Sequence, residues 1–276
     1  MEKKKGGMEN LQARTYDSSF LRTFLECPYR SYLRYIKRWV LIEEPEGRAF
    51  GAAFHEALDV YYEEGKTLTD AITTLRENLP AQVGDPTKSR EHGELLLQEY
   101  FKKWGKDPWI IRDKEVEFQV DMPNERIFSG RIDLIIESST GIYVVDHKTS
   151  RSVSSQFIKE YDPPNLQMEG YAYACIELVG ECRGVIINGI STAKNPSDRF
   201  CRIVPPRKPE IYPIIFKESV DRFESYAAQN YFPKNLASCN HYGGCPFRDT
   251  CVYGEKKEIL AMKFKQEKFD ARPDSR

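Results

Sequence analysis

Two β-type runs, each containing an acidic residue, constrain this sequence more than any other feature. Residues 130–136 contain Asp133, and residues 142–149 end with Asp146 and Lys148 two positions apart. Both runs are dense in Ile or Val, and the turn-forming residues between them predict a β-hairpin. Because side chains alternate along a strand, Asp146 and Lys148 share one face. Two carboxylates and an ammonium on a sheet face suit a divalent cation and a phosphate.

The pair formed by the second carboxylate and the lysine also has a simpler interpretation, an exposed ion pair worth under about 1 kcal/mol. Three features weigh against it. Asp133 lies among apolar neighbours, and a buried carboxylate needs a partner or a metal. His55 borders the apolar stripe of an expected helix, and Gln167 and Tyr171 share one face of another. The last three residues each have a structural alternative as well: a packing histidine, a solvated glutamine and a core tyrosine.

Composition limits the class of protein. The chain has 276 residues with 40% hydrophobic content, enough for one large domain or a domain with a helical cap. Its 41 basic and 42 acidic residues give a net charge of −1, so any surface for nucleic acid must be a local groove. No apolar run approaches the roughly 20 residues that span a bilayer, and no apolar stretch follows the basic N-terminus. We therefore expect a cytoplasmic protein without membrane contact.

Periodicity separates a helical first part from a mixed remainder. Apolar spacing of three and four predicts helices over residues 48–64, 69–79 and 90–104, after a helical stretch at 18–39 that Cys27-Pro28 interrupts. From Lys114 the period changes to two. Further expected elements are a helix at 166–178, strands at 184–190 and 200–204, a helix at 214–230 and a charged closing helix. This order predicts an α/β fold whose mixed sheet is flanked by helices.

The seven cysteines fall into two groups. Three lie in or beside apolar stretches and are interpreted as small buried residues: Cys175, Cys182 and Cys201. Cys239, Cys245 and Cys251 follow the pattern C-x5-C-x5-C in a loop that contains Gly and Pro, which indicates metal ligands. The gaps are wider than is usual for zinc, and a fourth soft ligand must come from elsewhere. Cys27 is the obvious donor.

The motifs together resemble the PD-(D/E)xK nuclease superfamily, in particular its RecB-like branch with an iron–sulfur cluster, as in CRISPR-adaptation exonucleases and helicase–nucleases. Their order is Gly-x-x-x-His, Gly-x-x-Asp, Asp-x-Lys and Gln-x-x-x-Tyr, and the likeness runs from Cys27 to Cys251. It implies a restriction-endonuclease-like core, with the N-terminal helical region clasped to the C-terminus by a metal cluster.

The resemblance also implies roles for individual residues. Asp133, Asp146, His55 and the backbone carbonyl of His147 would bind Mg²⁺ or Mn²⁺. Lys148 would orient the attacking water or offset charge in the transition state. The last motif would support the lysine or touch the DNA backbone, through Gln167 and Tyr171.

The four outer cysteines would hold a [4Fe–4S] cluster by the same resemblance. This sequence departs from the usual family spacing, in which the first gap among the late cysteines is two residues. Zn²⁺ therefore stays an alternative for Cys27, Cys239, Cys245 and Cys251, and His241 is a minor candidate for replacing one of them.

The resulting hypothesis is a metal-dependent deoxyribonuclease, an exonuclease on single-stranded DNA ends with 5′ to 3′ polarity favoured. Recombination, repair or CRISPR adaptation is its expected setting, with protein partners there. The alternative is an inactive or zinc-stabilised nucleic-acid-binding module within a larger assembly. The expected parts are a flexible N-terminus (1–15), a helical region with Cys27 and His55 (16–110), the nuclease core (111–232), the cysteine-rich cluster loop (233–254) and a charged tail (255–276).

Overall fold

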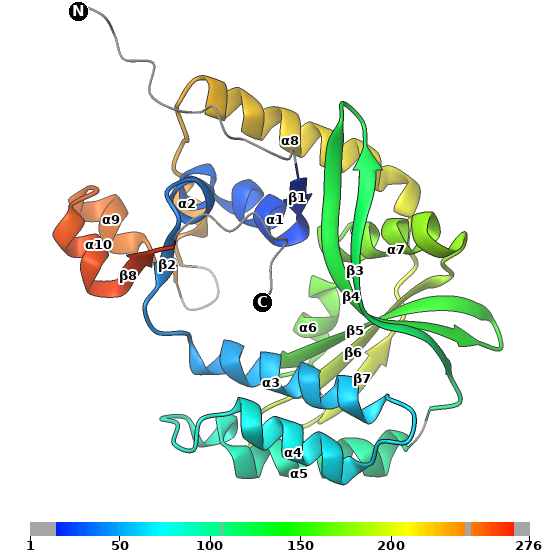
Figure 1. The fold of residues 1–276 in the computed structure, drawn as a ribbon. Helices are drawn as coiled ribbons and strands as arrows, with labels where there is room; N and C mark the ends of the chain where they lie inside the picture. Colours follow the sequence, from blue (N-terminus) through cyan, green and yellow to red (C-terminus); the bar gives the residue numbers. More distant parts are fainter. Residues whose placement is uncertain (1–14, 106, 241–243, 268–276) are drawn as a thin grey trace, which may run out of the picture.

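A six-stranded mixed sheet forms the centre of the computed structural model, which describes residues 15–105, 107–240 and 244–267 (Figure 1). The strand order is β1-β4-β5-β6-β7, and β3 also pairs with β4. The strands are β1 (Thr15–Asp17), β3 (Ile110–Met122), β4 (Arg126–Ser138), β5 (Gly141–Ser150), β6 (Gly184–Ser191) and β7 (Phe200–Ile203). The pairs β1–β4 and β5–β6 are parallel and the others antiparallel, which confirms the expected mixed sheet.

The hairpin expected around the two acidic residues is present as β4 and β5. Ser138 pairs with Gly141 across a two-residue loop, and Gly141 has a φ of 124°, a conformation open mainly to glycine. At the other end of the pairing, Leu134 lies opposite Val145. Asp133 and Asp146 therefore lie one position beyond this pair, on neighbouring strands.

One face of the sheet is covered by helices from three parts of the chain: α1 (Ser18–Glu26), α6 (Ser155–Glu160) with α7 (Leu166–Val179), and α8 (Tyr212–Ala228). The crossover that joins the parallel strands β5 and β6 consists of α6 and α7, since parallel neighbours need a long connection. Phe128, Met168 and Phe223 are completely or almost completely buried in the core between these helices and the sheet. This packing fixes α7 close to the end of β5.

A three-helix layer lies on the other side of the sheet (Figure 1), formed by α3 (Glu46–Tyr61), α4 (Leu68–Asn78) and α5 (Arg90–Trp104). Phe50, Phe54 and Leu75 are fully buried within it, and the same core includes Ile190 of β6. The helical spacing found in the sequence is thus the spacing of buried side chains. Among the described residues, no helix has the length and apolar character required to cross a membrane.

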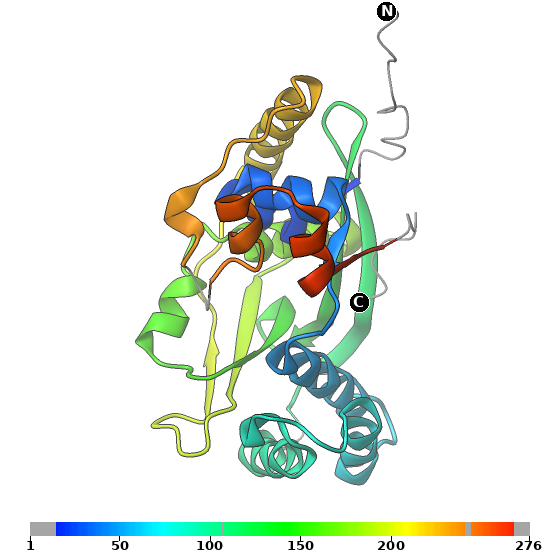
Figure 2. The ribbon, with the colours of Figure 1, turned by 90° about the vertical axis from the view of Figure 1, so that its left-hand side faces the viewer.

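A segment of the N-terminal region and the last described part of the chain come together in a small unit apart from the central sheet (Figures 1 and 2). In it, β2 (Trp39–Leu41) pairs antiparallel with β8 (Phe264–Gln266), beside α9 (Arg248–Tyr253) and α10 (Lys257–Lys263). The sequence predicted a helix up to Trp39 and a helix at the end of the chain. Both predictions are wrong where the chain forms β2 and β8. The reason is tertiary packing. The ring of Phe264 is buried and stacks on that of Phe247, with 4.4 Å between the ring centroids.

The remaining short helical segments connect these elements: α2 (Pro28–Ser31), η1 (Tyr32–Ile36), η2 (Pro86–Lys88), η3 (Pro209–Ile211) and η4 (Leu236–Ser238). The expected interruption at Cys27-Pro28 is confirmed, because α1 ends at Glu26 and α2 begins at the proline. Cys27 is the cap between the two helices and has extended backbone angles. This bend directs the chain from the sheet toward the small terminal unit.

Candidate active site

Asp146 and Lys148 form a contact inside the molecule and not on its surface. Lys148 Nζ donates to Asp146 Oδ1 at 2.7 Å and lies equally close to Oδ2, which receives no well-oriented hydrogen bond. The Asp146 side chain is 2% exposed and that of Lys148 is 23% exposed. The interpretation as an exposed ion pair is therefore excluded. Burying these charges is costly unless they are paired or used.

Asp133 joins this pair from the neighbouring strand. Its Oδ2 accepts a hydrogen bond from the backbone N–H of His147 at 2.7 Å and lies 3.4 Å from Nδ1 of His55. His55 lies on α3, and the apolar face of this helix packs into the helical layer. Helix α3, which is far from the β4–β5 hairpin in the sequence, thus converges with it on one point.

The two carboxylates have opposite electrostatic surroundings. Burial raises the pKa of Asp146, with the negative charge of Asp133 adding to the rise and Lys148 opposing it. Burial also acts to raise the pKa of Asp133, but the neighbouring His55 outweighs it and holds that pKa below its usual range. The pKa of Lys148 is raised because its acidic neighbours outweigh burial. Opposed shifts in adjacent groups are typical of functional sites.

Gln167 and Tyr171 lie one turn apart on α7, where Gln167 Nε2 donates to the Tyr171 hydroxyl at 2.9 Å. Burial and then the charge of Asp146 raise the pKa of this phenol, whereas Lys148 opposes the rise. Tyr171 is therefore close to the buried pair. The structure brings together all six candidate side chains from four elements: His55, Asp133, Asp146, Lys148, Gln167 and Tyr171.

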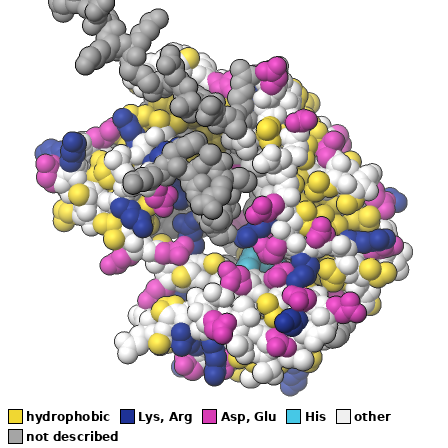
Figure 3. Space-filling model, in the orientation of Figure 1, with side chains coloured by type: hydrophobic (Ala, Val, Ile, Leu, Met, Phe, Trp, Pro, Cys, Tyr) yellow, Lys and Arg dark blue, Asp and Glu magenta, His cyan; other side chains and the backbone are white. Residues whose placement is uncertain are grey.

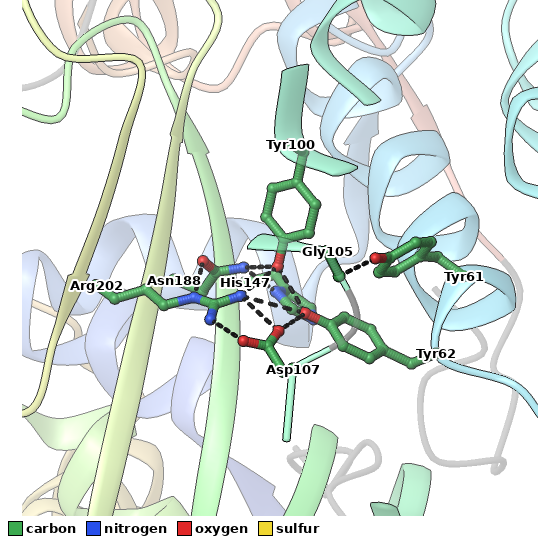
Figure 4. Close-up of polar contacts among 8 residues, drawn as sticks. All are labelled: Tyr61, Tyr62, Tyr100, Gly105, Asp107, His147, Asn188 and Arg202. Carbon is green, nitrogen blue, oxygen red and sulfur yellow. Dashed lines mark hydrogen bonds and ion pairs between the residues drawn. The ribbon is translucent and has the colours of Figure 1, made fainter. Parts of the chain in front are cut away.

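The ring of His147 lies on the opposite face of β5 and is held by a polar network (Figure 4). Asn188 Oδ1 accepts from Arg202 Nε at 3.1 Å, and because arginine only donates, this contact fixes the orientation of the amide. Asn188 Nδ2 is then the atom 2.7 Å from His147 Nδ1. Nδ1 must accept, so the neutral ring carries its proton on Nε2. Burial lowers the pKa of His147 to about 3, which keeps the ring neutral.

Arg202 is the centre of this network, and sequence reasoning missed it. Its guanidinium donates to both carboxylate oxygens of Asp107, at 2.5 and 3.0 Å, and to the Tyr100 hydroxyl at 2.9 Å. The same group lies over the rings of Trp104, at 3.9 Å, and Trp109, at 4.5 Å. Its only sequence signal was an arginine inside a short β-type run. The network ties α5 and the segment before β3 to the strands behind the site.

The chemistry of Asp133, Asp146 and His55 suits a divalent cation, although these side chains are not arranged around one. Within residues 15–105, 107–240 and 244–267, no three His, Cys, Asp or Glu side chains form a group that could hold a metal ion as they stand. Two carboxylates and an imidazole are nevertheless ligands that Mg²⁺ or Mn²⁺ accepts. The Asp146 oxygen without a well-oriented partner is buried, and such an acceptor favours a cation.

The four outer cysteines lie near one another at the terminal unit. The backbone N–H of Cys245 donates to the carbonyl of Cys239 at 2.9 Å. The backbone N–H of Asn235 donates to the sulfur of Cys27 at 3.4 Å. Burial raises the pKa of both Cys245 and Cys251, and electrostatic interaction with the neighbouring Cys27 and Cys239 adds to each rise. All are free thiols, and no described triplet is arranged as a metal site. His241 lies outside the described residues.

A groove of about 1280 Å³ leads away from the candidate site. At one end it is lined by Thr149 and Gln167, and at the other by Trp39 and Phe247. Figure 3 shows a face on which acidic and basic side chains are interspersed around a histidine near its middle. Among the residues that the structure describes, five basic and four acidic side chains line the groove: Arg22, Arg30, Arg34, Arg48, Lys265, Glu26, Glu44, Glu160 and Glu267.

Comparison with known families agrees with this geometry. A model described as the PD-(D/E)XK nuclease superfamily matches residues 18–252. The chain belongs to the PD-(D/E)XK nuclease superfamily. Nucleases of this superfamily usually use divalent metals and act on DNA. The family and the fold class expected from the sequence are confirmed, and the cluster-bearing branch stays a prediction.

One solved structure, an exonuclease by its description, shares the fold of this PD-(D/E)XK chain at low sequence identity. A proposed exonuclease from Eubacterium rectale has a TM-score of 0.51 and 13% identity, covering 91% of this chain and 99% of its own. An alkaline exonuclease from Laribacter hongkongensis gives a TM-score of 0.34 and 12% identity, covering 66% of this chain and 90% of its own. No curated protein matches the sequence.

Proposed function

We propose that this chain is a metal-dependent deoxyribonuclease that hydrolyses phosphodiester bonds at the ends of single-stranded DNA, with 5′ to 3′ polarity favoured. The observation that carries the proposal is the buried Lys148–Asp146 contact beside Asp133 and His55. A half-buried ammonium paired with a buried carboxylate, next to a second one, contributes little to stability alone, since apolar residues of similar size would serve as well. It is a good solution for charge that develops on a phosphate.

Asp133, Asp146 and His55 would hold Mg²⁺ or Mn²⁺, with the His147 carbonyl as a further ligand. When bound, the ion lowers the pKa of a water molecule and polarises the phosphate. The hydrogen bond from the His147 amide restrains Asp133, so one of its oxygens is fixed in direction. A single network therefore positions the first carboxylate and the ring behind it.

Lys148 would orient the attacking water and offset negative charge on the phosphate oxygens. The water forms the new P–O bond, the bond to the leaving oxygen breaks, and the leaving oxygen takes up a proton. Gln167, bonded to Tyr171, lines the groove beside this point and would restrain Lys148 or touch the DNA backbone.

Single-stranded DNA fits the composition of the groove better than a duplex. Its basic and acidic lining nearly balance, and Glu26 pairs with both Arg22 and Arg30. Trp39 and Tyr35 also line it, and aromatic rings bind single strands by base stacking. We expect affinity to depend only weakly on salt, since few phosphates would be neutralised.

The cysteines would clasp the two ends of the chain through a [4Fe–4S] cluster, with Zn²⁺ as the alternative. Support comes from the electrostatic proximity of Cys27 to the three late cysteines. DNA end processing of this kind belongs to recombination, repair or CRISPR adaptation, with protein partners there. An inactive binding module is the alternative, and the candidate catalytic residues argue against it.

Digestion of single-stranded oligonucleotides labelled at the 5′ or the 3′ end, with Mg²⁺ or Mn²⁺, tests the proposal. We expect Asp146→Asn and Lys148→Met each to lower the rate by about 10²–10³-fold, since both residues would contact the reacting groups. Exposed residues of the same type serve as controls: Asp121→Asn on β3 and Lys159→Met on α6 should retain the rate. Digestion that survives Asp146→Asn would overturn the assignment.

A further inference from the structure

Tyr161 is an unassigned phenol at the mouth of the candidate site. It follows α6 and lines the groove together with Thr149 and Gln167. Its hydroxyl has no hydrogen-bond partner among the residues that the structure describes. Burial raises the pKa of Tyr161 to about 12, with Lys148 opposing the rise and Asp146 adding to it. The phenol therefore lies within electrostatic reach of the buried catalytic pair.

A buried ion pair holds the backbone of this tyrosine. Arg207 Nη2 donates to the carbonyl of Tyr161 at 2.6 Å, and Arg207 Nη1 lies 3.4 Å from Glu169 Oε1. The side chains of Arg207 and Glu169 are 2% and 0% exposed. The backbone N–H of Lys208 donates to the other Glu169 oxygen at 3.3 Å, so both carboxylate oxygens are engaged.

The position of this pair connects it to the site. Glu169 lies on α7 between Gln167 and Tyr171, and a fully buried carboxylate is an unusual residue for a helix interior. Desolvating both charges costs more than apolar packing would, so stability alone does not account for the pair. The planar guanidinium of Arg207 bridges the Glu169 carboxylate and the Tyr161 carbonyl, however, and this leaves the backbone at Tyr161 little freedom to move. The helix that presents Gln167 thus also fixes Tyr161.

We propose that Tyr161 is a substrate-contacting residue whose hydroxyl donates to a phosphate oxygen of the DNA strand next to the scissile bond, and that Arg207, held by Glu169, positions it. The inference rests on the proposed nuclease function and adds a residue outside the four motifs. Arg207 touches no substrate in this scheme and acts only through the Tyr161 backbone.

Kinetics on a 5′-labelled single-stranded oligonucleotide test the role of the hydroxyl. Tyr161→Phe removes only that hydroxyl, and losing a hydrogen bond to a charged group should raise KM about tenfold or more, with kcat changed less. Tyr231→Phe, at an exposed ring, should leave both constants unchanged. A KM for Tyr161→Phe equal to that of the parent would overturn the proposal.

Arg207→Lys tests the positioning role, because lysine keeps the charge but cannot bridge two acceptors in a fixed plane. We expect its KM to rise, whereas Arg183→Lys, an exposed control, should keep the KM of the parent, and melting curves confirm that each variant is folded at the assay temperature. The double variant Tyr161→Phe/Arg207→Lys should be no worse than the poorer single variant, since both changes act on one contact. Additive effects on KM would show that Arg207 acts independently and would contradict the scheme.

A binding measurement separates this inference from the proposed function. Fluorescence anisotropy of a labelled single strand in EDTA needs no hydrolysis, and Tyr161→Phe should weaken binding about tenfold there as well. If the parent binds the strand but hydrolyses nothing, the nuclease function fails while the contact stands. If Tyr161→Phe binds as tightly as the parent, the contact fails whatever the activity.

Discussion

Asn188 holds the ring of His147 across the parallel pair of strands β5 and β6, with its Nδ2 2.7 Å from His147 Nδ1. The two residues are register partners, so both side chains stand on the face opposite Asp146. The amide also bonds Tyr100 and Arg202, and it is fully buried. One side chain therefore satisfies three polar groups in the wall behind the site.

Replacing Asn188 by leucine should destabilise the protein by about 3 kcal/mol or more, because several buried polar groups lose a partner at once. Urea denaturation gives the free energy of unfolding of the variant and the parent. Asn195→Leu, at an exposed loop position, is the matched control and should differ from the parent by under about 0.5 kcal/mol. Equal stability of the two variants would show that the network does not contribute.

Asp107 and Arg202 should show strong energetic coupling. Their side chains are 8% and 12% exposed, and removing one partner leaves the other charge buried. We expect Asp107→Asn and Arg202→Met each to cost about 3–5 kcal/mol. The double variant should cost much less than the two losses added together, as a double-mutant cycle from denaturation curves would reveal. Additive losses would mean that the pair contributes little.

Gly170 on α7 has no room for a side chain. A Cβ there would lie 2.8 Å from the ring of Tyr212 and 2.9 Å from that of Phe128, both fully buried. Gly170→Ala should therefore destabilise by about 1–3 kcal/mol despite the better helix propensity of alanine.

Gly47 provides the contrasting control for that substitution. It lies in the exposed first turn of α3, where the nearest atom to a new Cβ is 3.8 Å away. Gly47→Ala should leave stability unchanged or raise it by up to about 1 kcal/mol. Thermal unfolding of both variants checks the pair of predictions. A stabilising Gly170→Ala would contradict the close packing of α7 on the sheet.

Local patterns in the sequence were sufficient for the hairpin and for most helices. Apolar spacing placed the helix at residues 90–104 at its observed bounds, and the acidic positions in the two strands converged as the alternation required. The candidate residues His55 and Gln167 were predicted because they match motifs of the nuclease superfamily, and the structure places them beside the acidic pair. The hairpin and the helices depend on contacts between residues that are close in the sequence.

Features that depend on contacts between residues distant in the sequence were not predicted. Trp39–Leu41 and Phe264–Gln266 become strands only because they pair with each other across more than two hundred residues. The roles of Arg202 and Arg207 were not predicted, since nothing local indicates that aromatic rings enclose one and Glu169 pairs with the other. Charged side chains in a tertiary network carry no sequence period.

A metal held by the four outer cysteines would stabilise the protein by joining distant parts of the chain. Cys27 comes from the start of the chain and its three expected co-ligands from the end, so a bound metal would close a loop of roughly two hundred residues. By analogy with a disulfide, such a closure contributes about 4–5 kcal/mol, comparable to the net stability of a domain. Cys27→Ser should therefore lose the metal and release the terminal unit, in which β2 and β8 pair.

Anaerobic purification with a visible spectrum and metal analysis measures the first effect, and denaturation the second. Cys201→Ser, on β7 and away from the clasp, should keep both the metal content and the stability closer to those of the parent. A brown preparation with iron and sulfide supports the cluster, whereas a colourless one with stoichiometric zinc selects the alternative metal. If the parent contains no metal and Cys27→Ser unfolds at the same urea concentration, the clasp itself is wrong, because the four thiols then contribute no more than their packing.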